Sequence, residues 1–377
     1  MKIKFIPMPA GVFRMKPVYV QGLPPGPGPE AIASVVKDIV LKATDNLAWL
    51  HEGETVLIKP ALNSPDPYPS TTHPLAVSVT AGLLAGRRAN VVIGDQSGIG
   101  HVLHHPGGVL HGRTSENYAR SGMGGQGDPR FVSFEEGGWD EGFYRHSSPG
   151  TGSWRNGFFI TAWAKKADHI ISLPRVSAHS QAGATLGFKS MVGMLREDSR
   201  MEFHANGPYN GFITRAARGS TLESVDDGTG TFFEKIVEIS DAVRDKLRLT
   251  LFVATEVQAT FGPDRYGIRA GPVSIGKAYG MQPDPPLVFG SADPVAAEAA
   301  ALALLKDTRK SLPVLPRLVH RMVLFQNPHV QGLDRTGVRD HPYIRHGMKI
   351  GLGAMPGGLV FANVPGPARD RLQELLR

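Results

Sequence analysis

A strand–helix–strand pattern constrains the fold of this 377-residue chain more than any other feature of its sequence. Two short apolar runs, at 55–59 and 89–94, flank a segment at 73–86 with helical periodicity that opens with His73-Pro74. Units of this kind form right-handed crossovers between parallel strands. The pattern therefore predicts a parallel sheet with helices packed against it.

The same alternation recurs along the rest of the chain. Further strands are expected at 169–173, 249–254, 286–290 and 358–361, and further helices at 29–48, 231–247, 293–302, 341–349 and 366–376, with a short helix within 161–173 before its strand. We therefore expect an α/β fold with a largely parallel, Rossmann-like sheet and helices on both of its faces.

Glycine and proline, with 45 and 30 residues, gather in segments that show little periodicity. These segments are 21–30, 97–160 and 174–230. Structureless loops of this length are uncommon and usually functional. We expect a main α/β domain at 1–285 with a loop-rich insertion at about 97–160, and a smaller C-terminal α/β lobe at 286–377 that completes the sheet or packs on it.

The chain contains no cysteine, which excludes disulfides, thiolate zinc sites, cysteine nucleophiles and cysteine-ligated iron–sulfur clusters. Its net charge of +7 is spread without a basic run, so no nucleic-acid partner is expected. Pro7 and Pro9 interrupt the apolar run that a signal peptide needs, and no stretch approaches the ~18 apolar residues of a membrane span. We expect a cytoplasmic protein without a membrane partner.

Polar side chains follow three of the expected strands. Lys59 and Asn63 come after the first strand, Asp95 and Ser97 after the second, and Glu256 after the strand at 249–254. Ligands in open α/β sheets bind at the carboxyl ends of strands. We expect the first four residues to bind an anionic substrate and Glu256 to act as a general base or a metal ligand, with solvated strand-end side chains as the alternative.

The densest group of reactive side chains follows the strand at 169–173. It consists of Arg175, His179, Lys189, Ser190 and His204. We expect the arginine and the serine to bind an anionic substrate, and the lysine and both histidines to act in catalysis by moving protons. The segment 183–190 is not a phosphate-binding loop, because three residues separate its glycines and Phe188 precedes the lysine.

Histidines also make a metal site an open alternative. His101 begins a cluster of four histidines in a glycine-rich segment, and His101, His179 and His204 are the candidate ligands. An ordinary exposed loop is the other interpretation of that cluster. The sequence does not name a metal or a cofactor.

The order of these motifs resembles the bacterial and archaeal family called Domain of Unknown Function 362. The matching pieces are Val56-Leu-Ile-Lys-Pro-Ala-Leu-Asn63, His73-Pro74, Gly94-Asp95, Ala167-Asp168, Leu173-Pro174, His179, Gly187-Phe-Lys189-Ser190-Met-Val-Gly193, His204 and Gly290-Ser-Ala-Asp293-Pro294. The family usually has Asn where Ala61 stands and Lys-Asn where Lys189-Ser190 stands. Many members carry a cysteine-rich ferredoxin segment, which this chain cannot have, so no iron–sulfur cluster is expected.

A more distant likeness concerns the lactate racemase family, which uses a nickel-pincer nucleotide. The matching positions are His179, Ala182-Gly183, Lys189-Ser190 and His204. The resemblance implies a lysine that holds the cofactor covalently, and histidines that transfer protons or bind the metal. The double glycine that precedes Lys-Ser in that family is replaced here by Gly187-Phe188, so the identity of the cofactor does not carry over.

Together these features predict an enzyme that acts on a small carboxylate-bearing anion by His/Lys acid-base chemistry, of isomerase, lyase or related type. One alternative is a protein with a divalent metal or nickel-pincer nucleotide, similar to lactate racemase. Another is a non-catalytic protein that binds a small molecule or a partner. A homodimer is also considered, and the substrate is not identified.

Overall fold

A computed structural model describes residues 15–205 and 231–377, apart from 126, 129, 266–267 and 271–272. The expectations for the N-terminal ten residues and for 206–230 lie outside the described residues. The central sheet is built from β1 (Val18–Gly22), β2 (Thr55–Pro60), β3 (Asn90–Asp95), β6 (Phe131–Ser133), β9 (His169–Leu173), β12 (Leu247–Ala254), β17 (Leu287–Ser291) and β18 (Leu359–Ala362).

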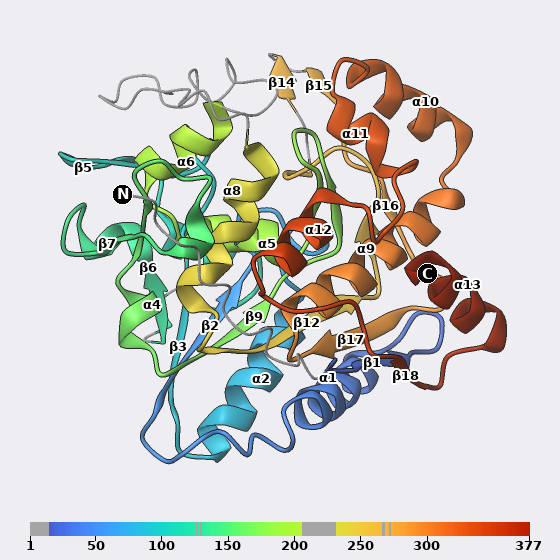
Figure 1. Ribbon diagram of the computed structural model, residues 1–377, viewed down its shortest axis with the longest axis horizontal. Coiled ribbons are helices and arrows are strands. Elements are labelled where there is room, and N and C mark those ends of the chain that lie inside the picture. Colours follow the sequence, from blue (N-terminus) through green and yellow to red (C-terminus); the bar gives the residue numbers. More distant parts are fainter. Residues whose placement is uncertain (1–14, 126, 129, 206–230, 266–267, 271–272) are drawn as a thin grey trace, which may run out of the picture.

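The eight strands are arranged in the order β18-β1-β17-β12-β9-β2-β3-β6 (Figure 1). All neighbouring pairs in this sheet are parallel, except the two that β17 forms with β1 and β12. This arrangement confirms the expected α/β class with a largely parallel sheet.

Helices cover both faces of the sheet, as the alternation of strands and helices predicts. The longer ones are α1 (Pro29–Ala43), α2 (Pro74–Gly86), α9 (Pro294–Lys310), α10 (Val314–Val323) and α13 (Gly366–Leu376). The shorter ones are α3 (Thr114–Arg120), α4 (Trp163–Lys166), α5 (Gly187–Ser190), α6 (Glu197–Ala205), α8 (Phe232–Glu238), α11 (Pro328–Leu333) and α12 (Pro342–Lys349). Helices α1 and α2 share one apolar core with the sheet, and α9 belongs to the core on the opposite face (Figure 1).

Local capping explains where several of these helices begin. The side chain of Asp293 accepts a hydrogen bond from the Ala296 amide at 2.9 Å, and proline follows at the first helical position of α9. His73 caps α2 in the same way through the Leu75 amide. The predicted helix at 29–48 instead ends at Ala43, because the turn that follows it takes up left-handed backbone conformations at Asp45 and Asn46.

Two further expected boundaries differ in the structure. The predicted helix at 231–247 is α8 followed by a 3₁₀ turn at 239–243, and β12 begins at Leu247 because that residue already pairs with β9.

The insertion at 97–160 is not one irregular loop. It holds α3, the hairpins β4 (Leu103–His105)–β5 (Gly108–His111) and β7 (Phe143–His146)–β8 (Phe158–Thr161), and β6, which joins the edge of the central sheet.

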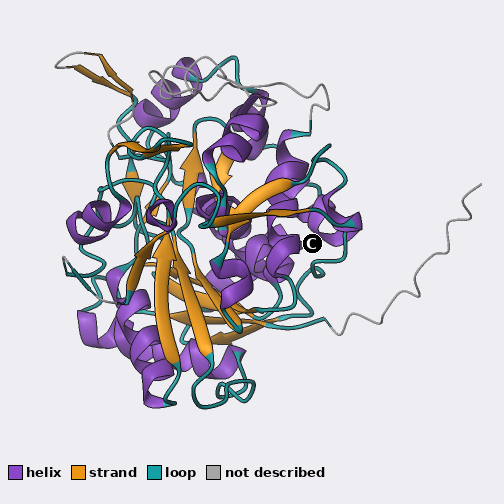
Figure 2. Cartoon of the chain, turned by 90° about the vertical axis from the view of Figure 1, so that its left-hand side faces the viewer, coloured by secondary structure: helices purple, strands orange, loops and turns teal. Residues whose placement is uncertain are grey.

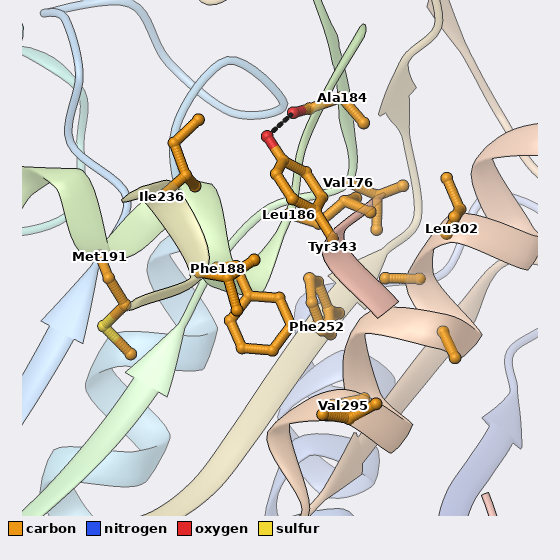
Figure 3. Close-up of a cluster of buried hydrophobic side chains, with 14 of the residues drawn as sticks. Val176, Ala184, Leu186, Phe188, Met191, Ile236, Phe252, Val295, Leu302 and Tyr343 are labelled. Carbon is orange, nitrogen blue, oxygen red and sulfur yellow. Dashed lines mark hydrogen bonds between the residues drawn. The ribbon is translucent and has the colours of Figure 1, made fainter. Parts of the chain in front are cut away.

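The glycine-rich segment after β9 is buried rather than a surface loop. It forms β10 (Ser177–His179), β11 (Gly183–Thr185), α5 and α6, and with β13 (Val257–Gln258) and β16 (Gly280–Met281) it builds a second small sheet. Phe188 and Met191 pack into the apolar core beside Tyr343, whose hydroxyl donates to the Ala184 carbonyl at 3.4 Å (Figure 3). The hairpin of β14 (Ile268–Ala270) and β15 (Val273–Ile275) projects from the opposite end of the molecule to α1 and α2 (Figure 2).

Candidate functional site

A small cavity of about 50 Å³ lies where the carboxyl ends of β2, β3 and β9 meet the segment after β9. Its described lining consists of Ala61, Leu62, Asn63, Asp95, Gln96, Gly98, Arg175, His179, Thr185, Lys189, Ser190, Val192, Gly193, Arg200 and Pro263. The cavity therefore lies at the edge of the sheet where the strand-end side chains were predicted to gather.

A buried ion pair lies beside this cavity, and only its carboxylate, that of Asp95, is part of the described lining. The Lys59 ammonium lies 2.8 Å from Oδ1 of Asp95, and neither side chain reaches solvent. Lys59 also donates to the carbonyls of Pro60 and Ser190, at 2.7 and 3.1 Å. All three ammonium hydrogens thus have acceptors. Burial lowers the pKa of Lys59, and the charge and hydrogen bond of Asp95 oppose that shift.

Arg175 is the buried charge that lacks partners. It follows the Leu173-Pro174 end of β9, and its side chain is only 1% exposed. Nη2 donates to the Pro263 carbonyl at 2.8 Å, whereas Nε and Nη1 have no hydrogen-bond partner among the described residues. Burial lowers the pKa of Arg175 to about 10, so the guanidinium is still charged at neutral pH. Buried guanidinium groups are normally paired, so two of its donor groups are available to a ligand.

His179 is held in one tautomer by its own loop. Its Nδ1 accepts hydrogen bonds from the amides of Gln181 and Ala182, at 3.0 and 3.2 Å. The proton of the neutral ring therefore lies on Nε2, which makes His179 a hydrogen-bond donor. Burial, together with the charge of Lys189, lowers the pKa of this histidine well below its usual value.

Lys189 is the one lysine in the described lining of the cavity. It lies in α5, and within the described chain no carboxylate or hydrogen-bond acceptor holds its ammonium, while the ring of Phe203 lies 5.2 Å from Nζ. Burial, assisted by the charges of Arg200 and Arg175, lowers the pKa of Lys189 to about 7. Its neutral amine, the form that can accept a proton, is thus accessible near neutral pH.

Two hydroxyls and a second histidine complete the surroundings. The hydroxyls of Thr185 and Ser190 line the cavity without hydrogen-bond partners in the part of the chain that the structure describes. His204, near the end of α6, lies tilted against Phe203 with ring centroids 4.1 Å apart, and its Nδ1 has no hydrogen-bond partner among the described residues. Burial lowers the pKa of His204 well below its usual value, with Lys189 as the largest charge contribution. His204 therefore adjoins the lysine, although it is not among the described lining residues.

Other predicted site residues have hydrogen-bond partners within the protein. Asn63 donates to Asp264 at 2.5 Å, and His101 lies 2.8 Å from the same carboxylate. Burial alone would lower the pKa of His101, but the hydrogen bond and charge of Asp264 raise it. The Ser97 hydroxyl donates to the Leu62 carbonyl, so it braces the loop after β2.

Glu256 is not brought to this cavity. It lies in a separate cavity of about 630 Å³ with Ser70, Arg265 and Tyr279, where burial raises its pKa. The structure therefore unites Arg175, His179, Lys189 and Ser190 around one space and places Glu256 in another.

Sequence reasoning missed Arg200, which lies in α6 and is 2% exposed. Its guanidinium donates to the carbonyls of Leu195, Ser97, Gln96 and Gly193. These bonds fix the loop after β3 against α5 and α6. The surrounding Arg-Glu-Asp-Ser-Arg run is typical of a solvated helix face, so no local signal marks this arginine.

The described residues do not fit a resident metal or a nucleotide cofactor. They contain no group of three or more His, Cys, Asp or Glu side chains placed to hold a metal ion. The proton on Nε2 of His179 blocks that nitrogen as a ligand. A space of about 50 Å³ is also far below the roughly 300 Å³ at which pockets for larger organic ligands begin.

The fold and this site define an α/β protein with a buried, cationic pocket at the carboxyl edge of a mostly parallel sheet. The family model described as "Domain of unknown function (DUF362)" matches residues 56–303. The chain belongs to this family. None of the curated proteins matches the chain.

One solved structure with a partial likeness is that of the lactate racemase apoprotein from Thermoanaerobacterium thermosaccharolyticum. The two share 15% sequence identity with a TM-score of 0.37, over 67% of this chain and 52% of that one. The chain therefore spans about half the length of that protein.

Proposed function

We propose that the protein is an enzyme that binds a small carboxylate and moves a proton at the carbon beside it. The observation that carries this proposal is an excess of buried positive charge. Arg175, Lys189 and Arg200 line the cavity, while the lining carboxylate of Asp95 is already paired with Lys59. Buried charges require partners, so the cavity is suited to an anionic ligand.

The size of the cavity limits the ligand. A cavity holds one water molecule in about 10–15 Å³. The space of about 50 Å³ therefore accommodates roughly four non-hydrogen atoms, with more where the ligand reaches the rim. A two-carbon carboxylate, with four non-hydrogen atoms, meets this limit, and larger carboxylates fit where they extend to the rim.

Each side chain has a distinct role in this proposal. Arg175 binds the carboxylate through the donor groups that lack protein partners. The neutral amine of Lys189 accepts the proton from the adjacent carbon, and the two electrons of the C–H bond pass into the carboxylate to give an enediolate. His179 donates a hydrogen bond from Nε2 to the oxygen on which this charge develops.

The fate of the enediolate decides the reaction type. Return of the proton from the Lys189 ammonium to the opposite face of the enediolate gives an isomerase, with His204 as a neighbour of that lysine. Loss of a leaving group from the next carbon, which takes up the electron pair, gives a lyase. Both outcomes use the same first step.

Solvent exchange tests that first step without knowledge of the product. Small 2-hydroxy and 2-amino carboxylates are incubated with the protein in D₂O, and loss of the α-proton signal is followed by NMR. We expect exchange with at least one of them, and a loss of about 10²–10⁴-fold in Lys189→Met. His179→Asn keeps an acceptor near the position of Nδ1 but removes the Nε2 donor, so it should also be impaired.

The matched control is Lys37→Met, since Lys37 is an exposed lysine on α1. Binding of a carboxylate without exchange would instead favour a non-catalytic binding protein. The proposal also requires Lys189 to be unmodified. Intact protein from the native host should have the mass of the bare 40.5 kDa chain, and a heavier adduct on Lys189 would favour the cofactor alternative.

A further inference from the structure

Helix α10 and the turn after it expose an unusual run of large apolar side chains. The exposed fractions are 82% for Val314, 69% for Leu315, 51% for Leu318, 38% for Val319, 64% for Met322, 39% for Val323 and 67% for Phe325. Those on α10 form adjacent pairs that repeat every four residues, so they lie along one face of the helix. Contiguous apolar surfaces of this kind mark interaction sites.

The opposite face of α10 is firmly attached to the protein. His320 is 1% exposed, and its Nδ1 accepts a hydrogen bond from the Phe261 amide at 3.1 Å. Leu324 packs with Phe261 and Val330 in a small apolar cluster. The exposed face is therefore presented by an anchored helix, at a distance from the central sheet (Figure 1).

The charges of this segment have a single sign. Residues 308–333 contain Arg309, Lys310, Arg317 and Arg321, and no aspartate or glutamate. Arg309 is paired with Asp334, and Arg317 donates to three carbonyls at the end of α9 and the turn after it. Lys310, the last residue of α9, and Arg321, on α10 itself, are exposed.

The apolar face and the positive charges near it together favour one kind of binding partner over another. A second copy in a symmetric dimer would present the same patch, so its cations would meet cations without a carboxylate on the face to balance them. An anionic lipid surface offers an apolar phase for the leucine, methionine and phenylalanine side chains and negative charge for the two exposed cations.

We propose that α10 and Phe325 dock on an anionic lipid bilayer as a peripheral contact. No described helix is both long and apolar enough to cross a membrane. The proposed contact therefore needs no membrane-spanning segment. The expectation of no membrane partner from the sequence considered only such segments, so it does not bear on a peripheral contact. The docked helix also forms a wall of the 630 Å³ cavity through Leu315 and Val319.

Vesicle flotation of the full chain tests the proposal. The probes are vesicles of phosphatidylcholine alone and of phosphatidylcholine mixed with phosphatidylglycerol. We expect binding to the mixed vesicles that weakens as salt increases, because the exposed cations contribute. Leu318→Glu and Met322→Glu should each lower the partition coefficient at least about tenfold.

The matched control is Val360→Glu on β18, because Val360 is 49% exposed and thus close to Leu318 in exposure. It should bind vesicles like the wild type, and all variants should unfold at similar temperatures because the replaced side chains are exposed. The proposal is overturned if the wild type does not bind mixed vesicles, or if Leu318→Glu binds them equally well. It is also overturned if light scattering finds a dimer that Leu318→Glu converts to monomers, since a second copy then covers the face.

Discussion

The ammonium of Lys59 and the carboxylate of Asp95 meet at 2.8 Å at the ends of adjacent parallel strands, and the two side chains are 0% and 2% exposed. Through the Ser190 carbonyl, the same ammonium is bonded to the helix that carries Lys189. A Cβ atom on Gly193 would lie 1.9 Å from Asp95 Oδ1, so the chain after that helix also approaches the pair closely. The pair thus connects the sheet to the site.

Breaking this pair should be strongly destabilising. Lys59→Met or Asp95→Asn leaves one buried charge without its partner, which typically costs about 3–5 kcal/mol. Urea unfolding of the single variants and of Lys59→Met/Asp95→Asn should show a double variant that is more stable than the sum of the two losses predicts. Strict additivity would mean that the two side chains are not energetically coupled.

Lys189 should lower the stability of the protein. Because burial depresses its pKa to about 7 from an ordinary value of 10.5, the folded state binds fewer protons than the unfolded state between these pH values. The resulting penalty is fully present below pH 7 and is relieved as the pH rises toward 10.5. Lys189→Met should therefore raise the free energy of unfolding at pH 7 by about 1 kcal/mol or more, while Lys37→Met changes it little. A destabilised Lys189→Met would show that the ammonium has a partner.

Arg175 should determine the affinity for the anion. Arg175→Met removes the charge and both unpartnered donor groups, so the Kd for a bound carboxylate, measured by calorimetry, should rise at least about 30-fold. Arg175→Lys keeps the charge but not the planar geometry and should be intermediate. Arg345→Met, at an exposed arginine of α12, is the control. Unchanged affinity in Arg175→Met would place the anion elsewhere.

Asn327 should act as a positioning residue for His179. Its Nδ2 donates to the carbonyls of Ser180 and Gln181, at 2.6 and 3.0 Å, and its Oδ1 caps α11 through the His329 amide. Asn327→Asp keeps the cap but loses both donors, so kcat for exchange should fall while the pH dependence set by Lys189 is unchanged. If Asn327→Asp exchanges as fast as the wild type, the loop after His179 does not need this support.

Much of the fold is predictable because its main determinants are local. The runs at 55–59 and 89–94 are buried strands bounded by Pro60 and by Gly94-Asp95, and Asp293 with Pro294 marks the start of α9. The segment after β9 was expected to be loop because its glycines and polar residues carry no periodicity. Its burial depends on long-range partners, such as the bond from Lys59 to the Ser190 carbonyl, that no local pattern shows.

The candidate site is likewise predictable where it depends on local sequence and not where it depends on long-range contacts. Arg175, His179 and Lys189 were expected together because they follow one strand, and they line one cavity. Lys59 was expected to bind a ligand, but its hydrogen-bond capacity is filled by protein atoms. Glu256 also follows a strand of the same edge. A strand end predicts the edge of the sheet but not the side on which a side chain emerges, and Glu256 faces the larger cavity.

The pH dependence of proton exchange tests the central claim most directly. Below about pH 7 the amine of Lys189 is protonated and cannot accept a proton, so kcat/KM for α-proton exchange should fall about tenfold per pH unit there and level off above it. His179 and His204 stay neutral over this range, so they should add no further transition. The residual rate of Lys189→Met should lack the transition. A flat profile in the wild type, or the same transition in Lys189→Met, would contradict the assignment of Lys189 as the proton acceptor.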